Sequence, residues 1–368
     1  MGRRQGALEN MVKTVWENRR VYLTGHTGFK GSWMSLWLSS LGATVHGYAL
    51  APECDPNLFT NARVADRVEH EVGDIRDLAQ LERSIAAFKP EVVFHMAAQP
   101  LVRRSYANPI ETYSTNVMGT AHLLDAIRRA PSVRAVVVIT TDKCYENREW
   151  LWGYREQDRL GGFDPYSNSK ACAELVTAAY RNSYFPLARI ADHKVALASA
   201  RAGNVIGGGD WSEDRLIPDL VRGFISGKPV HIRYPQAIRP WQHVLEPLAG
   251  YMALAEHLLR DGAGFASAWN FGPAEEDAWP VGRIADAMTA VWGAGGNWVS
   301  DTAENPHEAG YLKLDASKAR ALLGWRPVLP LEDALRWVGE WFLAWRQGED
   351  MRAFTLRQIA EYQGRLLK

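Results

Sequence analysis

The feature that most constrains the fold is a glycine-rich turn set between a short apolar run and an apolar segment of helical spacing. The run Val21–Leu23 leads into Thr-Gly-His-Thr-Gly-Phe-Lys-Gly at positions 24–31, and the helical segment covers Trp33–Leu41. Glycines allow a tight turn and a close approach to a pyrophosphate, whose charge the N-terminus of the next helix attracts. The turn therefore predicts a dinucleotide site, although its GxxGxxG spacing is unusual and glycine turns also serve plain loop geometry. The residues expected to contact the cofactor here are Gly25, Thr27, Gly28, Phe29, Lys30 and Gly31.

Strand and helix patterns alternate through the first half of the chain. We expect strands at 21–24, 44–50, 67–72, 92–95, 135–140 and 194–200, and helices at 33–41, 78–88, 115–129 and 166–180. This alternation predicts an α/β fold with a doubly wound parallel sheet, the Rossmann arrangement. In such sheets the ligand binds beyond the carboxyl ends of the strands.

The pattern loosens after about residue 205, where glycine, proline and tryptophan become frequent. We expect a smaller mixed α/β lobe there, closing over the carboxyl edge of the sheet. The predicted division is a cofactor-binding domain at 15–204, with 240–275 returning to it, and a substrate-binding lobe at 205–368. The 368 residues suit this arrangement, because single cores rarely grow beyond about 250–300 residues.

Composition narrows the possible partners. Lysine plus arginine and aspartate plus glutamate each number 42, so the net charge is zero and gives no support for nucleic-acid or anionic-membrane binding. No apolar run has the length of a membrane span. The three cysteines (Cys54, Cys144 and Cys172) are few, odd in number and unclustered, which indicates reduced thiols in the cytoplasm and no metal site.

Tyr166 and Lys170 are four residues apart in a predicted helix and therefore lie on one face of it. A lysine beside a phenol favours the phenolate and lowers the tyrosine pKa, which makes the tyrosine a usable base for a hydroxyl proton. Asp164 and Pro165 suit the start of this helix. An isolated pair at this spacing is usually solvated surface, but this one follows a glycine turn and several strands.

A second motif, Thr140-Thr141-Asp142-Lys143, directly follows the β-branched strand at 135–140, at the sheet edge where catalytic groups gather. Threonine and aspartate also form ordinary turns. A lysine placed there, facing a second lysine and a cationic nicotinamide, would have its pKa depressed by like charge and could accept a proton. Lys143 is therefore a candidate base.

Together these motifs resemble an extended short-chain dehydrogenase/reductase. Longer stretches at 26–37, 95–106, 141–147, 161–175, 201–219 and 239–244 resemble one branch of that superfamily, the CDP-D-glucose 4,6-dehydratases. The glycine turn and Tyr-x-x-x-Lys identify only the superfamily. Thr-Asp-Lys-Cys-Tyr-Glu-Asn, Arg-Ala-Gly-Asn-Val-Ile-Gly-Gly-Gly-Asp-Trp and Arg-Pro-Trp-Gln-His are more specific, and the likeness runs from about residue 14 to the C-terminus.

The resemblance implies an NAD-dependent lyase that converts CDP-D-glucose to CDP-4-dehydro-6-deoxy-D-glucose and water, in deoxysugar and O-antigen polysaccharide synthesis. Tyr166, helped by Lys170 and Thr141, would remove the C4 hydroxyl proton while hydride passes to NAD and later returns to C6. Asp142 would protonate the departing C6 hydroxyl. Lys143 would take the C5 proton or stabilise the enolate, and the related dTDP-glucose dehydratases carry glutamate at this position.

The resemblance also assigns binding residues and an assembly. NAD is implied, although strand two ends without the usual acidic residue, at Leu50-Ala51-Pro52. The helices at 115–129 and 166–180 pair in dimers of this superfamily, which implies a homodimer or a dimer of dimers. Further cofactor contacts are expected from Asp74, Ile75, Ala97, Ala98, Gln99, Thr140, Tyr166 and Lys170, and substrate contacts from Asn204, Arg215, Leu216, Arg239, Asn270, His307 and Tyr311.

Two other functions stay open. A nucleotide-sugar 4-epimerase, or a dehydratase for another nucleotide, would share the fold, but an epimerase needs no acid for a leaving hydroxyl, so Asp142 and Lys143 favour dehydration. A catalytically silent NAD-binding protein would have lost Tyr166 or Lys170, and both are present. The sequence does not fix the nucleotide base or the affinity for NAD.

Overall fold

The central sheet positions the predicted catalytic and cofactor residues. The computed structural model describes residues 15–301 and 310–368, and in this part of the chain seven parallel strands pair in the order β10-β6-β5-β4-β1-β2-β3. Their bounds are β1 Arg20–Thr24, β2 Thr44–Ala49, β3 Glu69–Val72, β4 Val92–His95, β5 Ala135–Ile139, β6 Ala196–Ala202 and β10 Ala268–Phe271. The order reverses between β1 and β4, the switch point at which ligands bind in such sheets. The predicted doubly wound parallel sheet is confirmed.

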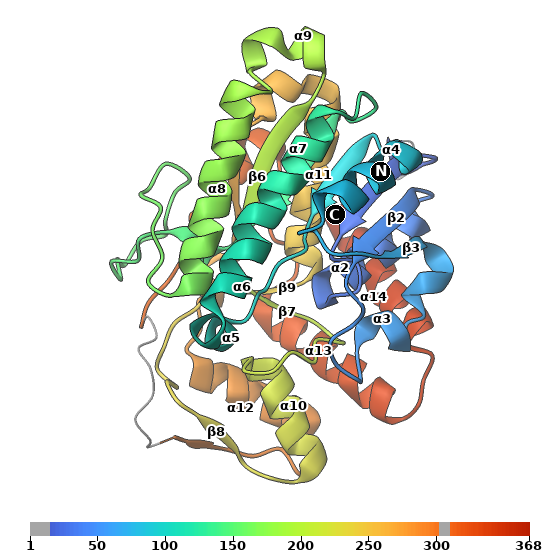
Figure 1. Cartoon of the computed structure of the whole chain (residues 1–368). Helices are drawn as coiled ribbons and strands as arrows, with labels where there is room; N and C mark the ends of the chain where they lie inside the picture. Colours follow the sequence, from blue (N-terminus) through green and yellow to red (C-terminus); the bar gives the residue numbers. More distant parts are fainter. Residues whose placement is uncertain (1–14, 302–309) are drawn as a thin grey trace.

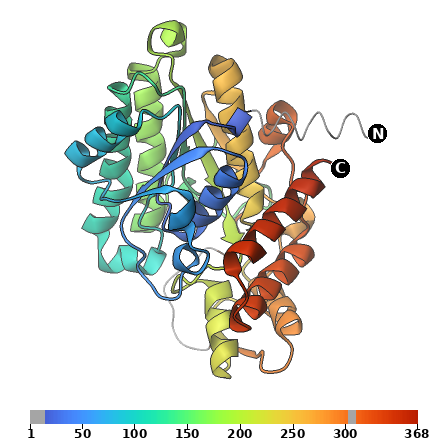
Figure 2. The same cartoon turned by 90° about the vertical axis from the view of Figure 1, so that its right-hand side faces the viewer.

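Helices cover both faces of the sheet (Figures 1 and 2). One face packs against α4 (Leu78–Phe88), α7 (Gly119–Arg128) and α8 (Pro165–Ser183), and the other against α2 (Phe29–Ser40) and α11 (Leu245–Phe265). The residues of β4, β5 and β6 are buried throughout, as strands covered on both faces must be. The expected helix at 115–129 is divided, because residues Ser114–Met118 form a π-helical turn before α7.

The smaller lobe lies beyond the carboxyl edge of the sheet, where Figure 1 shows α10, α12 and β8 below it. There β8 pairs with β11, and β7 pairs with β9 closer to the sheet. The bounds are α10 Leu216–Ser226, α12 Val281–Trp292, β7 Asn204–Ile206, β8 Val230–Ile232, β9 Trp241–His243 and β11 Trp298–Ser300. The strand β10 and helix α11, both inside the segment 240–275, lie on the main sheet.

The last two helices, α13 (Leu331–Arg346) and α14 (Met351–Leu366), run back from the lobe, and α14 contacts α2 on the flank of the sheet. Figure 2 shows both helices, in red, along that flank. The remaining short helices are α3 Leu58–Asn61, α5 Val102–Ala107, α6 Pro109–Tyr113 and α9 Ile190–His193, with single turns at 64–67, 142–144, 187–189, 275–277 and 319–323. Among the described residues, none of the helices is both long and apolar enough to cross a membrane.

Candidate active site

A cavity of about 1000 Å³ opens between the carboxyl edge of the sheet and the smaller lobe. It brings together most of the residues predicted to be catalytic or to bind substrate. Those that line it are Lys30, Thr140, Thr141, Asp142, Lys143, Tyr166, Asn204, Arg215, Leu216 and Arg239. They come from the end of β5, the start of β7, the first turns of α2, α8 and α10, and the segment before β9, so the topology of the sheet explains their meeting.

Tyr166 stands in the first turn of α8. The helix begins at Pro165, and the carboxylate of Asp164 accepts a hydrogen bond from the Ser167 amide at 2.9 Å, which fixes the orientation of this turn. Burial raises the pKa of Tyr166 to about 12, against the lowering effects of a hydrogen bond between the Tyr166 and Thr141 hydroxyls and of the Arg215 charge. The expected lowering of the Tyr166 pKa is therefore wrong when only the residues of the chain surround it, because burial raises this pKa more than the contacts with Thr141 and Arg215 lower it.

Lys170 lies one helical turn further along α8 and is buried. Its ammonium donates a hydrogen bond to the carbonyl of Ile139, the last residue of β5, at 3.2 Å. Burial lowers the pKa of Lys170 to about 8, although the neighbouring carboxylate of Glu174 raises it. Lys170 is thus held behind Tyr166 at the same strand end, as the four-residue spacing predicts.

The segment Thr141–Cys144 directly follows β5, and we call it the catalytic turn because it carries three of the residues predicted to be catalytic. The Thr141 hydroxyl caps it by accepting the Lys143 amide and donates to Asp142 Oδ1 at 2.9 Å. Asp142 is 1% exposed, and its Oδ2 has no hydrogen-bond partner among the described residues. Burial raises the pKa of Asp142 against the charges of Lys143 and Arg239. A carboxyl group that keeps its proton closer to neutral pH suits an acid.

The glycine turn has no room for larger residues at Gly25 and Gly31. Gly25 has φ +79°, and a Cβ there would stand 2.7 Å from the Ala97 amide nitrogen, while a Cβ on Gly31 would stand 2.1 Å from the Gly25 carbonyl oxygen. Gly28 precedes α2, and no described side chain caps this helix, so its first amide groups are open to an anion. The Thr27 hydroxyl donates to the Leu50 carbonyl at 2.8 Å and ties the turn to β2.

The predicted cofactor residues beyond the turn differ in their accessibility. Ala97 and Ala98 are half-buried beside the turn. The Asp74 carboxylate is bound by Arg76, and the Ile75 side chain is buried against Gly119. The Gln99 side chain is used inside the protein, where it donates to Leu101 and Thr112. The Ile75 and Gln99 side chains are therefore packed or bonded inside the protein, whereas the Asp74 carboxylate, paired with Arg76, is 28% exposed.

Among the predicted substrate residues, the structure brings four to the cavity and separates two. Arg215 donates to Asp210 Oδ2 at 3.0 Å, and Asn204, Leu216 and Arg239 line the cavity beside it. Asn270 is fully buried, and its amide bonds the backbone carbonyls of Tyr154 and Asp315, so its place among the described residues is structural. The Tyr311 hydroxyl donates to Leu151 at the rim. His307 lies outside the described residues.

Two residues that sequence reasoning missed stand directly behind the cavity. Glu174 on α8 and Arg201 on β6 form an ion pair of 2.8 Å, and each side chain is 3% exposed. Glu174 follows Lys170 by four residues, the same spacing that separates Tyr166 from Lys170. Extending that spacing by one helical turn would have identified Glu174 as a neighbour of the site.

The parallel sheet, the glycine turn at the switch point, and the Tyr-x-x-x-Lys motif whose tyrosine lines one cavity together with Thr-Asp-Lys define an extended short-chain dehydrogenase/reductase of the epimerase and dehydratase class. The family model described as GDP-mannose 4,6 dehydratase matches residues 23–257, and the chain belongs to this family.

The relatives agree with this assignment. The chain is 57% identical over 350 residues to a CDP-glucose 4,6-dehydratase of Salmonella typhimurium, covering 95% of this chain and 98% of that protein. MoeE5, solved in complex with UDP-glucuronic acid and NAD, superposes with a TM-score of 0.72 at 25% identity, over 88% of this chain and 98% of that chain. The UDP-glucose 4-epimerase of Thermotoga maritima shares the fold, with a TM-score of 0.77 at 21% identity, over 89% and 99% of the two chains.

Proposed function

We propose that the chain is a CDP-D-glucose 4,6-dehydratase, which converts CDP-D-glucose to CDP-4-dehydro-6-deoxy-D-glucose and water. The observation that carries the proposal is the catalytic turn Thr141–Cys144, whose buried acid Asp142 and neighbouring Lys143 line one cavity with Tyr166. An epimerase has no use for this acid, because no hydroxyl leaves. The 57% identity to a CDP-glucose 4,6-dehydratase supports the choice of substrate.

The glycine turn fits NAD as the cofactor. The close approach of Gly25, Gly28 and Gly31 and the uncapped first turn of α2 would hold the pyrophosphate, with Lys30 beside it. The buried Lys170 would face the nicotinamide ribose. Bound there, NAD would supply the acceptor for a hydride from C4 of the sugar and the donor that returns it to C6.

The residues of the chain move the protons. Tyr166, hydrogen-bonded to Thr141, takes the proton of the C4 hydroxyl as the C4 ketone forms. The ketone acidifies the C5 proton. Lys143 either removes this proton or stabilises the enolate that forms when the proton leaves. Asp142 gives its proton to the departing C6 hydroxyl, which leaves as water. A positive nicotinamide and Lys170 offset the raised pKa of Tyr166 when the cofactor is in place.

The arginines bind the other end of the substrate in this proposal. Arg239, which is 8% exposed, and Arg215 carry the positive charges on the lobe side of the cavity, and a guanidinium pairs well with diphosphate oxygens. The nucleoside then extends toward β8 and β11, with Tyr311, whose neighbour Leu312 lines the cavity, beside it. In this arrangement residues 15–204 and 240–275 hold NAD and the rest of 205–368 holds the nucleotide sugar. We also propose a cytoplasmic homodimer or dimer of dimers, paired through α7 and α8, acting in O-antigen synthesis.

The deciding experiment is incubation with NAD and, separately, CDP-glucose, dTDP-glucose and GDP-mannose, followed by the alkaline absorbance of a 4-keto sugar. We expect product from CDP-glucose. Product from another nucleotide sugar alone would refute the substrate, and interconversion at C4 without loss of water would favour an epimerase.

A matched variant tests the base. Tyr166→Phe keeps the buried ring and removes only the hydroxyl, so we expect an unchanged unfolding temperature and a loss of turnover of about 10²-fold or more. Near-normal turnover would remove Tyr166 from its role.

A further inference from the structure

The ion pair Glu174–Arg201 is the most buried charged pair near the cavity, and neither residue is among those that line it in the described part of the chain. Burying two charges costs free energy, so such a pair needs further hydrogen bonds to be tolerated. Glu174 and Arg201 form these further hydrogen bonds with residues on either side of the catalytic turn.

Glu174 holds the residue that precedes the catalytic turn. One of its carboxylate oxygens accepts a hydrogen bond from the hydroxyl of Thr140. The other accepts from Ser199 at 2.6 Å and from Arg201 at 2.8 Å. Thr140 is therefore fixed by a buried carboxylate that comes from α8, the helix that carries the proposed base.

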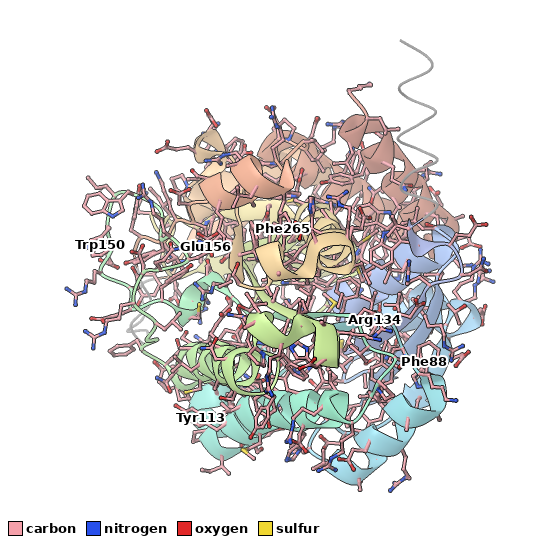
Figure 3. All side chains as sticks on the ribbon, turned by 90° about the horizontal axis from the view of Figure 1, so that it is seen from above. Phe88, Tyr113, Arg134, Trp150, Glu156 and Phe265 are labelled. Atoms are coloured by element: carbon pink, nitrogen blue, oxygen red, sulfur yellow. The ribbon has the colours of Figure 1, made fainter. Side chains whose placement is uncertain are left out.

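Arg201 holds the residue that follows the turn. Its second guanidinium nitrogen donates to the Tyr145 hydroxyl at 2.8 Å and to the Glu156 carbonyl at 3.1 Å. Figure 3 shows Glu156 closer to the body of the protein than Trp150, which stands at the outer edge. The Tyr145 hydroxyl donates in turn to Asn270 at 2.8 Å. The two members of one ion pair thus hydrogen-bond to the residues that flank the segment Thr141–Cys144 on either side.

Glu174 also acts on Lys170, its neighbour one helical turn away. Its negative charge raises the pKa of Lys170 against the larger lowering effect of burial. The other titratable groups around Lys170 are Tyr166 on the same helix, Cys144 in the catalytic turn, Lys30 on α2 and His95 at the end of β4. Unlike these groups, Glu174 carries a negative charge, because Arg201 keeps the pKa of its carboxyl group low despite burial.

We propose that Glu174 and Arg201 are positioning residues: their hydrogen bonds to Thr140 and Tyr145 fix the catalytic turn from both ends, and α8 places the Glu174 carboxylate one helical turn from Lys170. Neither touches the substrate; they act through Thr140, Tyr145 and Lys170. The consequence for turnover rests on the proposed dehydratase function, whereas the consequence for Lys170 does not.

The first test is Glu174→Gln, with Glu246→Gln as its control, the same change in a buried carboxyl group of α11 away from the cavity. The readout is an NMR titration of the Lys170 ammonium, assigned with Lys170→Met. An opposite charge within about 4–6 Å shifts a pKa by about 1 to 3. We expect Glu174→Gln to move the Lys170 titration, and the alkaline limb of kcat/KM with CDP-glucose, by about 1 pH unit or more toward acid. The control should move neither.

The second test keeps the ion pair and removes the hydrogen bond by which Arg201 holds Tyr145. Tyr145→Phe removes the hydroxyl that joins Arg201 to Asn270 but keeps the buried ring. Because a misplaced catalytic group costs up to about 10²-fold, we expect kcat to fall by about tenfold or more with KM and the Lys170 titration nearly unchanged.

The outcomes separate the hypotheses. If Glu174→Gln leaves the Lys170 titration unchanged, the proposed effect of Glu174 on Lys170 is wrong. If Tyr145→Phe leaves kcat unchanged, the proposed positioning of the catalytic turn by Arg201 is wrong. If Glu174→Gln fails to fold, Tyr145→Phe still decides the second point, and the milder Glu174→Asp, which keeps the charge, should leave the Lys170 titration in place. Absence of turnover in the unmodified protein would refute the proposed function alone.

Discussion

Asp142 lies directly against Gly203 beside the cavity, so that a Cβ added to Gly203 would stand 3.1 Å from Asp142 Oδ2. The same Cβ would stand 2.4 Å from the Pro240 side chain, so this position has no room for any larger residue. Oδ2 is the carboxyl oxygen without a partner among the described residues. The strand-end glycine therefore leaves space for this buried, unpartnered oxygen in the wall of the cavity that Asp142 lines.

Replacing this acid should stop elimination without stopping the earlier proton transfers. Asp142→Asn keeps the size of the side chain and removes the proton donor, so we expect 4-keto-6-deoxy product to fall by about 10²- to 10⁴-fold. Uptake of solvent deuterium at C5 of CDP-glucose should continue, because Tyr166 and Lys143 remain. Loss of deuterium uptake together with product would show that Asp142 acts earlier than we propose.

Two substitutions of Lys143 distinguish its possible roles. Lys143→Ala removes both base and charge, whereas Lys143→Arg keeps a positive charge that does not lose its proton. If Lys143 takes the C5 proton, both variants should stall deuterium uptake at C5 by about 10²-fold or more. Recovery of uptake in Lys143→Arg alone would assign Lys143 to electrostatic stabilisation of the enolate, and normal uptake in both would remove it from this step.

The parts of the site that local sequence patterns encode could be predicted. The glycine turn, the end of β5 and the Tyr166–Lys170 spacing are each read within one or two elements, and the parallel sheet brings strand ends to one edge. Asn270 could not be placed correctly in this way. Its role depends on the loop at Tyr154 and on Asp315, which reach β10 from distant parts of the chain.

Electrostatics was the least predictable property. The spacing of Tyr166 and Lys170 predicts a lowered tyrosine pKa, but the spacing contains no information on how deeply the phenol is buried, and burial decides the direction. The ion pair of Glu174 with Arg201 was hidden for a related reason. It joins α8 to β6, so it exists only because the helix packs on that part of the sheet.

Lys30 is the charged residue of the glycine turn, and its ammonium makes no hydrogen bond or ion pair within the described residues although it lines the cavity. Burial and the charges of Arg215 and Lys170 lower its pKa to about 7. We expect Lys30→Met to weaken binding of NAD or CDP-glucose by about tenfold at pH 6, since a charge-assisted hydrogen bond contributes about 1.5–3 kcal/mol. Isothermal titration calorimetry measures this, with the exposed Lys228→Met as control. If Lys30→Met bound NAD and CDP-glucose with the same affinities as the unmodified protein, the Lys30 charge would face neither ligand.

The C-terminal helix is held by a buried carboxyl group whose protonation should make stability depend on pH. Glu246 accepts the Val328 and Leu329 amides and the Tyr362 hydroxyl, and burial raises its pKa from 4.5 to about 7. A folded-state pKa above the unfolded one gives stability that is full below about pH 4.5 and is lost as pH rises through about 7. Glu246→Gln mimics the protonated form, so the unmodified protein should lose up to about 3 kcal/mol relative to it as the pH rises from about 4.5 to about 7, with little further change above that. Urea unfolding at several pH values measures this difference, with the exposed Glu349→Gln as control. A difference that does not change with pH would show that Glu246 stays ionised in the folded protein.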